Sequence, residues 1–114
     1  VNYVESAKER GILVLIAGAG MAAALPGAVA ALTPLPVLGV PMEGKLLGGL
    51  DAMLAMAQMP GGIPVGTLAV GKAGAVNSAI LATSIIALSD EKISTNLDKY
   101  RSKQSADVNE EPID

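Results

Sequence analysis

The stretch ILVLIAGAGMAAALPG, residues 12–27, decides the fold of this chain. It opens with an apolar run, residues 12–17, whose length and β-branched content are typical of a strand buried on both faces of a sheet. Gly18 and Gly20 follow at once. Because glycine adopts positive φ and has no Cβ, we expect the backbone to turn sharply here and to lie close to a bound group. Parallel sheets bind ligands at such carboxyl ends of strands.

Outward from this stretch, apolar runs alternate with segments of helical pattern. Residues 35–40 and 63–70 are apolar and bounded by proline or glycine, which predicts two further buried strands. Strands that alternate with helices indicate an α/β domain with a parallel sheet and right-handed crossovers. A helix already precedes the first strand and only three strands are found, so we expect the opening strands of the domain to be missing from this chain.

The predicted helices occupy residues 1–10, 50–58, 75–88 and 90–103. Gly11 ends the first of them, and Asp90 is the expected N-cap of the last. Proline is acceptable at the first position of a helix. We therefore expect a short turn of helix up to Leu25 and a second helix that starts at Pro26.

The composition excludes several kinds of chemistry. The 114 residues form one domain at most, and 51% of them are hydrophobic but only 2% aromatic, so the core is aliphatic. The absence of Cys and His excludes disulfides, thiolate nucleophiles, the usual zinc sites and imidazole acid–base catalysis. With a net charge of −3 and no basic cluster, nucleic acid is not an expected partner.

Two long stretches without charge raise the question of a membrane. They lie between Arg10 and Glu43 and between Asp51 and Lys72, but prolines and glycines cut both into pieces too short to span a bilayer. No signal-peptide pattern is found in residues 1–10, so we expect a cytoplasmic location. We divide the chain into a domain, residues 1–103, and a polar, acidic tail, residues 104–114.

The glycine motif has two further interpretations. Residues 18–23, GAGMAA, fit the dinucleotide fingerprint G-x-G-x-x-[G/A] after a strand, although Pro26 comes too early for the continuous helix that should receive a pyrophosphate. The same glycines can also serve only as a tight turn. Lys72 follows the third predicted strand and belongs to the same edge of the sheet, where it can face a ligand.

Other polar and sulfur-containing residues have plain structural explanations. Glu43, Lys45 and Asp51 are expected to be helix caps or solvated side chains. Met53, Met56 and Met59 are expected in the core or at a subunit interface rather than around a cofactor.

Three motifs occur together in one family. AGAGMAAALPG, LTPLPVLGVP and GLDAMLAMAQMPGGIPVGTLAVGKAGAVNSAILA closely resemble the PurE family of 5-(carboxyamino)imidazole ribonucleotide mutases, also described as phosphoribosylaminoimidazole carboxylase catalytic subunits. The resemblance implies a flavodoxin-like three-layer α/β/α fold, a homo-octamer whose C-terminal helix packs on neighbouring subunits, and a step of purine biosynthesis. In that step a carboxylate moves from an exocyclic nitrogen to the ring carbon of an aminoimidazole ribonucleotide, through carbon dioxide held in the site. Neither a metal nor a cofactor is implied.

The resemblance also implies a set of substrate-binding positions: Ala17, Gly18, Ala19, Gly20, Ala24, Leu25 and Pro26. Backbone N–H groups of residues 18–20 would hold the carboxylate or the carbon dioxide, while Leu25 and Pro26 would line a dry pocket. The family has His where this chain has Ala24, so no catalytic residue is identifiable.

Two further family motifs are absent. The family carries a Gly-Ser-x-Ser-Asp loop and a Ser-Ala-His-Arg motif, which supply phosphate binding and the acid–base His, and both would lie upstream of Val1. We therefore expect a mutase or carboxylase that is impaired alone, and the alternative is a non-catalytic truncated homologue that acts as a structural or assembly subunit. Copies are expected to associate, because missing strands would expose an apolar sheet edge.

Deletion of residues 104–114 should change the melting temperature by less than about 3 °C, because this acidic segment has too few apolar side chains to offset its ordering entropy. Thermal denaturation followed by circular dichroism measures the effect. A loss of many degrees would mean that the segment packs against a folded surface.

Overall fold

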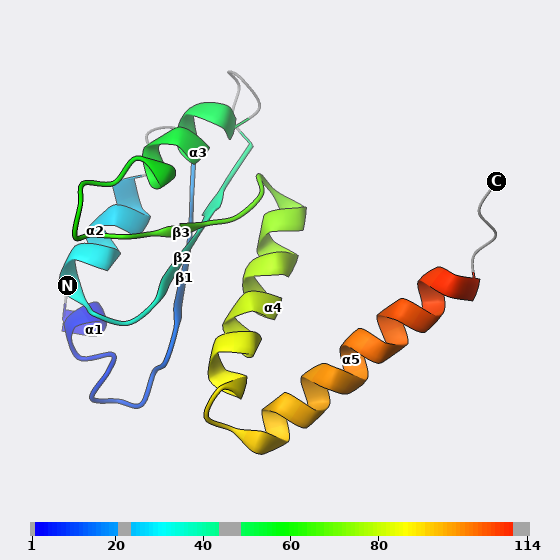
Figure 1. Cartoon of the computed structure of the whole chain (residues 1–114). Coiled ribbons are helices and arrows are strands. Elements are labelled where there is room, and N and C mark those ends of the chain that lie inside the picture. Colours follow the sequence, from blue (N-terminus) through cyan, green and yellow to red (C-terminus); the bar gives the residue numbers. More distant parts are fainter. Residues whose placement is uncertain (1, 21–23, 44–48, 111–114) are drawn as a thin grey trace. The chain divides into compact units, whose positions relative to one another are not determined.

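The computed structural model describes residues 2–20, 24–43 and 49–110 (Figure 1). The chain divides into two compact units, Val1–Ala82 and Thr83–Asp114, and each is described by itself. The elements, in chain order, are α1 (Asn2–Glu5), β1 (Leu15–Ala19), α2 (Ala24–Leu32), β2 (Val37–Pro41), α3 (Leu50–Ala57), β3 (Gly66–Thr67), α4 (Lys72–Ala87) and α5 (Glu91–Glu110).

The first unit is built on a parallel sheet with strand order β1-β2-β3. Leu15 of β1 lies opposite Val37, and Leu38 of β2 lies opposite Gly66. Helices α2 and α3 pack against the sheet, as Figure 1 shows. This arrangement confirms the predicted α/β fold with a parallel sheet and is consistent with a flavodoxin-like domain.

The core lies where α3 meets β2. All five residues of β2 are buried, and Met56 of α3 is 1% exposed. Met56 reaches this depth because residue 39 is glycine: a Cβ on Gly39 would lie 2.9 Å from Met56 Sδ and 3.1 Å from Val65 Cγ1. A buried methionine of this kind contributes roughly 2 kcal/mol through removal of its apolar surface from water. The prediction that Met56 belongs to the core is confirmed.

The strand boundaries differ from those predicted. β1 covers Leu15–Ala19 instead of residues 12–17, because its pairing with β2 begins only where the Leu15 N–H donates to the Pro36 carbonyl. Gly18 therefore lies within the strand. β3 is limited to Gly66–Thr67 instead of residues 63–70, and Pro64 has no N–H with which to extend the pairing.

Two helix predictions are corrected. α2 is described as one helix that begins at Ala24, so Pro26 lies within its first turn and does not begin a second helix. Proline is tolerated there because the N–H groups of a first turn have no partner within the helix. α5 continues to Glu110, past the expected end at residue 103, since no glycine or proline interrupts residues 91–110.

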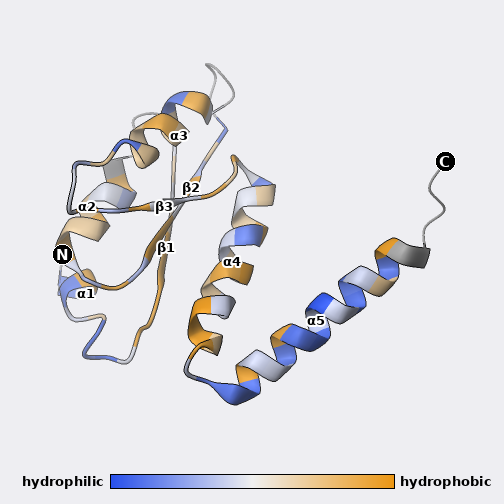
Figure 2. Ribbon diagram, viewed as in Figure 1, coloured by the Kyte–Doolittle hydropathy of each residue, from blue (hydrophilic) through white to orange (hydrophobic). Residues whose placement is uncertain are grey.

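The first helix ends earlier than predicted: α1 stops at Glu5 instead of residue 10, and Gly11, with φ +86°, closes the turns that follow it. The predicted cap of the last helix is found. The Ile93 N–H donates to Asp90 Oδ1 at 3.1 Å, which satisfies a free donor at the start of α5. Figure 2 shows the polar character of α5. Within the described ranges, no helix is both long enough and apolar enough to cross a membrane.

Replacement of Gly74 by Ala should lower the melting temperature by at least about 5 °C, because the new Cβ would overlap the Ala69 carbonyl oxygen. Alanine favours a helix by up to ~1 kcal/mol over glycine, and this gain is too small to offset a backbone displacement. Gly61→Ala is the matched control, since no atom of the described residues lies within 4 Å of its added Cβ. Equal melting temperatures for the two variants would contradict this account of α4.

Candidate functional site

The carboxyl ends of the three strands meet at one edge of the sheet. The Met42 N–H donates to the Ala19 carbonyl at 3.0 Å, and the Gly71 N–H donates to the Pro41 carbonyl at 2.8 Å. These bonds place the end of β1, the end of β2 and the start of α4 in one row. Gly49, just before α3, joins them, because a Cβ on it would lie 2.9 Å from the Met42 carbonyl oxygen.

The glycine motif at this edge has an extended backbone and no sharp turn. Neither Gly18 nor Gly20 has a positive φ, so the expected turn at these two residues is wrong. The backbone of Gly18 is extended because this residue pairs with Val40 in the parallel ladder between β1 and β2. The remainder of the motif, residues 21–23, lies outside the described residues.

The packing of the described residues does not itself require glycine at residues 18 and 20. A Cβ on Gly18 would lie 3.6 Å from Met42 Sδ, and one on Gly20 would lie 4.0 Å from Met42 Cβ, both ordinary contact distances. What glycine provides at Gly20 is an uncovered backbone, which a bound group can approach closely.

The other predicted positions are divided between core and surface. Ala17 is buried in β1, and Ala19 packs against the Ala52–Met56 cluster. Pro26 is fully buried near Gly39, whereas Leu25 is 53% exposed. Ala24 begins α2, but its side chain is not described. Ala19 and Gly20 therefore lie at the carboxyl edge, and Ala17 and Gly18 lie within β1. Leu25 and Pro26 do not share one surface.

The charged residues at the edge are few. The Glu43 side chain lies beside Gly71, with Oε1 3.6 Å from the position of an added Cβ. Asp51 is exposed in the first turn of α3, which agrees with the expected solvated role, and Lys72 is the exposed first residue of α4. Lys45 lies outside the described residues. The described ranges hold no group of three carboxylates or other ligands that could bind a metal ion.

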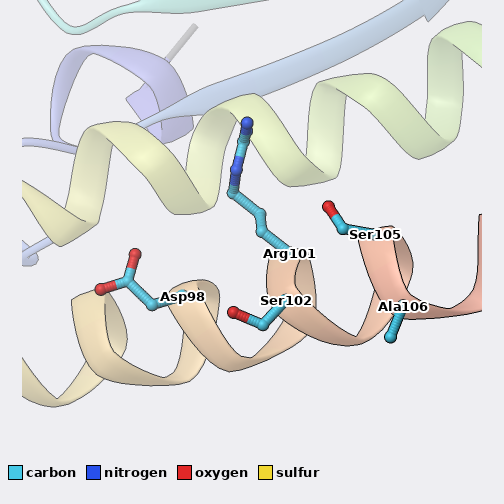
Figure 3. Close-up of a pocket in the computed structure, with 5 residues that line it drawn as sticks. All are labelled: Asp98, Arg101, Ser102, Ser105 and Ala106. Carbon is cyan, nitrogen blue, oxygen red and sulfur yellow. The ribbon is translucent and has the colours of Figure 1, made fainter. Parts of the chain in front are cut away.

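The hollow drawn in Figure 3 belongs to the second unit. Its lining residues, Asp98, Arg101, Ser102, Ser105 and Ala106, all project from successive turns of α5. A hollow lined by one helix has no second wall to enclose a small molecule. The better candidate site is therefore the carboxyl edge of the sheet at Gly18 and Gly20, here called the glycine edge. Sequence reasoning gave no signal for this hollow.

Comparison with known proteins adds the following similarities. The family model described as AIR carboxylase matches residues 1–107. The N5-carboxyaminoimidazole ribonucleotide mutase of Brucella melitensis is 54% identical over 112 residues, covering 98% of this chain and 69% of that protein. The mutase of Bacillus subtilis is 55% identical over 100 residues, covering 88% and 62%. The bifunctional purine synthesis protein purC/E of Dictyostelium discoideum is 54% identical over 113 residues, covering 99% and 11%. The chain thus spans about two thirds of the length of its bacterial relatives.

Replacement of Gly20 by Ala should leave the melting temperature within about 3 °C of the original, because the added methyl meets only ordinary contacts among the described residues. Gly39→Ala, in the neighbouring strand, is the contrasting variant, since its methyl would press on Met56 and Val65, and it should lower the melting temperature by several degrees. Scanning calorimetry of both variants is the measurement. A large loss in Gly20→Ala would show that the glycine is there for internal packing.

Proposed function

The chain belongs to the AIR carboxylase family, and we propose that it forms the core of an N5-carboxyaminoimidazole ribonucleotide mutase of purine biosynthesis. The observation that supports the site is the uncovered glycine backbone at the end of β1, where Gly20 leaves room for a substrate carboxylate. The family match extends over this motif and the two strands that follow it.

The proposed reaction is an isomerisation. The bond between the exocyclic nitrogen and its carboxyl carbon breaks and releases carbon dioxide. The ring carbon then attacks the carbon dioxide, forms a carbon–carbon bond and loses its proton, and one proton is gained at the nitrogen. Backbone N–H groups between Gly18 and Gly20 would orient the carboxylate and the carbon dioxide, because fixed donors stabilise such charge without reorganisation.

The remaining proposed contacts come from the start of α2. Ala24, Leu25 and Pro26 begin this helix, and the first N–H groups of a helix are free to meet an anion. We keep Leu25 and Pro26 as proposed pocket residues. Because Pro26 is buried and Leu25 exposed in the described chain, Leu25 is the one that would touch the substrate directly.

Acid–base chemistry must come from elsewhere. Proton transfer at the ring carbon requires a side chain whose pKa lies near neutrality, and the chain contains no His. Position 24, where the family pattern has His, is alanine. This supports the alternative in part: without additional polypeptide, the chain would serve as a structural or assembly subunit.

We also propose that the protein is a homo-oligomer, an octamer by analogy with the family, and that it works in the cytoplasm. Support for association comes from α4, in which residues 73–87 carry no charge while Val76 and Leu81 are exposed. Apolar side chains on several sides of a helix are typical of a helix that is covered by neighbours. Carbon dioxide and the aminoimidazole ribonucleotide are the proposed small-molecule partners.

The purified 114-residue chain should show little or no conversion of N5-carboxyaminoimidazole ribonucleotide, and Ala24→His alone should not restore it, because phosphate binding and acid–base groups are both lacking. Fusion to the segment of the Brucella melitensis relative that lies outside the match should restore turnover. Chromatographic assay of product formation measures this.

The same assay decides between the two functions. A folded fusion without turnover would favour the structural subunit, and rapid turnover by the chain alone would overturn the assigned roles. In the active fusion, Gly20→Ala tests by the same assay whether the glycine edge contributes to turnover, and Gly61→Ala is the control.

A further inference from the structure

The described methionines differ in how far their side chains reach solvent. Met56 is 1% exposed and lies in the core, and Met53 and Met59 are partly buried. Met42 is 46% exposed. A thioether packs adaptably against other groups, but it is also open to oxidation to a sulfoxide. Among these four residues, Met42 is therefore the one that an oxidant in solution reaches most easily.

Met42 lies at the glycine edge. Its N–H donates to the Ala19 carbonyl at 3.0 Å, directly after the end of β2. Its side chain lies beside β1: Sδ is 3.6 Å from the position of a Cβ on Gly18, and its own Cβ is 4.0 Å from the position of a Cβ on Gly20. No other side chain of the described residues lies within 4 Å of either position. The Met42 side chain is therefore the wall of this part of the edge.

The Met42 sulfur is separate from the core. Side chains alternate between the two faces of a strand, and Ala19 and Gly39 face the side of the sheet on which Met56 packs. Gly18 has the opposite orientation, so the Met42 sulfur lies on the other face. Oxidation of Met42 would leave the packing of α3 on β2 unchanged, whereas oxidation of Met56 would place a polar group in the core.

We propose that Met42 is an oxidation site that regulates the glycine edge: a peroxide converts the thioether to the sulfoxide, and the sulfoxide weakens binding of the substrate carboxylate. The second half of this statement rests on the proposed function. In the oxidation, a sulfur lone pair attacks one oxygen of hydrogen peroxide, an S–O bond forms and the O–O bond breaks. The leaving hydroxide takes the proton of the transferred oxygen and departs as water. Sulfur loses two electrons, and the peroxide gains them.

The sulfoxide changes the edge in two ways. Its oxygen adds volume beside Gly18 and Gly20, where the substrate carboxylate would approach the backbone. It also carries partial negative charge and accepts hydrogen bonds, so it repels a carboxylate and competes with it for backbone N–H groups. An apolar wall that excludes water becomes a polar one. Because enzymes that reduce methionine sulfoxide restore the thioether, the change is reversible.

The oxidation site is tested on the 114-residue chain with hydrogen peroxide. Peptide mapping by mass spectrometry should show that Met42 is oxidised at least about tenfold faster than Met56, and faster than Met53 and Met59, since susceptibility follows exposure. In the chain oxidised at Met42, the NMR amide shifts of Gly18 and Gly20 should move, whereas that of Gly61 should not. Equal oxidation of the four methionines, or unchanged shifts at Gly18 and Gly20, would overturn the proposal.

The effect on the reaction is tested in the fusion to the Brucella melitensis segment. Oxidation of Met42 should lower kcat/KM at least about tenfold, and Met42→Gln, which is polar and of similar length, should have a kcat/KM at least about tenfold below that of Met42→Leu. After the same peroxide treatment, Met42→Leu should lose less than about twofold relative to its own untreated value. Met53→Leu is the matched control and should stay as sensitive as the parent.

The outcomes separate this inference from the proposed function. A fusion that turns over and keeps its kcat/KM after Met42 is oxidised would overturn the regulation and leave the reaction standing. A fusion without turnover would overturn the reaction and the regulation that rests on it, while the peptide map and the amide shifts would still decide whether Met42 is an oxidation site. If Met42→Gln does not fold, the oxidised parent decides.

Discussion

The first unit of the structure depends on the burial of β2. This strand is bonded on both edges, by β1 and β3, and its five residues are shielded on both faces. Both conditions require close approach by neighbouring elements, and Gly39 permits it, because Met56 and Val65 occupy the space of an absent side chain. The positions of α3 and of the strand ends follow from this contact, and with them the row of backbone groups at the carboxyl edge.

Periodicity and composition predicted which helices and strands are present better than the residues at which they begin and end. The apolar segment that contains β2 was evident because prolines bound it, whereas β1 was placed too early, since Leu15 pairs only after Pro36 has brought β2 alongside. Local pattern carries no information about such a partner strand. The break at Pro26 was overestimated for a related reason: a proline's effect depends on its place in the helix, and Ala24 begins α2.

The sequence predicted where a site would lie more readily than how it would work. Gly18 and Gly20 lie toward the carboxyl end of β1, as predicted, but their backbone is extended, and their role in binding stays a prediction. The acid–base group could not be found in a chain without His. Two bacterial relatives contain residues that the chain does not match.

The turn after α3 has a practical meaning for work on this fold. The Ile63 N–H donates to the Pro60 carbonyl at 3.1 Å, and Gly62 has φ +101°. In the part of the chain that the structure describes, no atom lies within 4 Å of a Cβ on Gly61 or Gly62. The loop is closed by its own backbone and exposes its tip to solvent, at the amino end of β3 and away from the glycine edge. Such tips accept new chain termini and inserted domains. A fluorescent reporter or an affinity tag can thus be joined here without touching the carboxyl edge of the sheet.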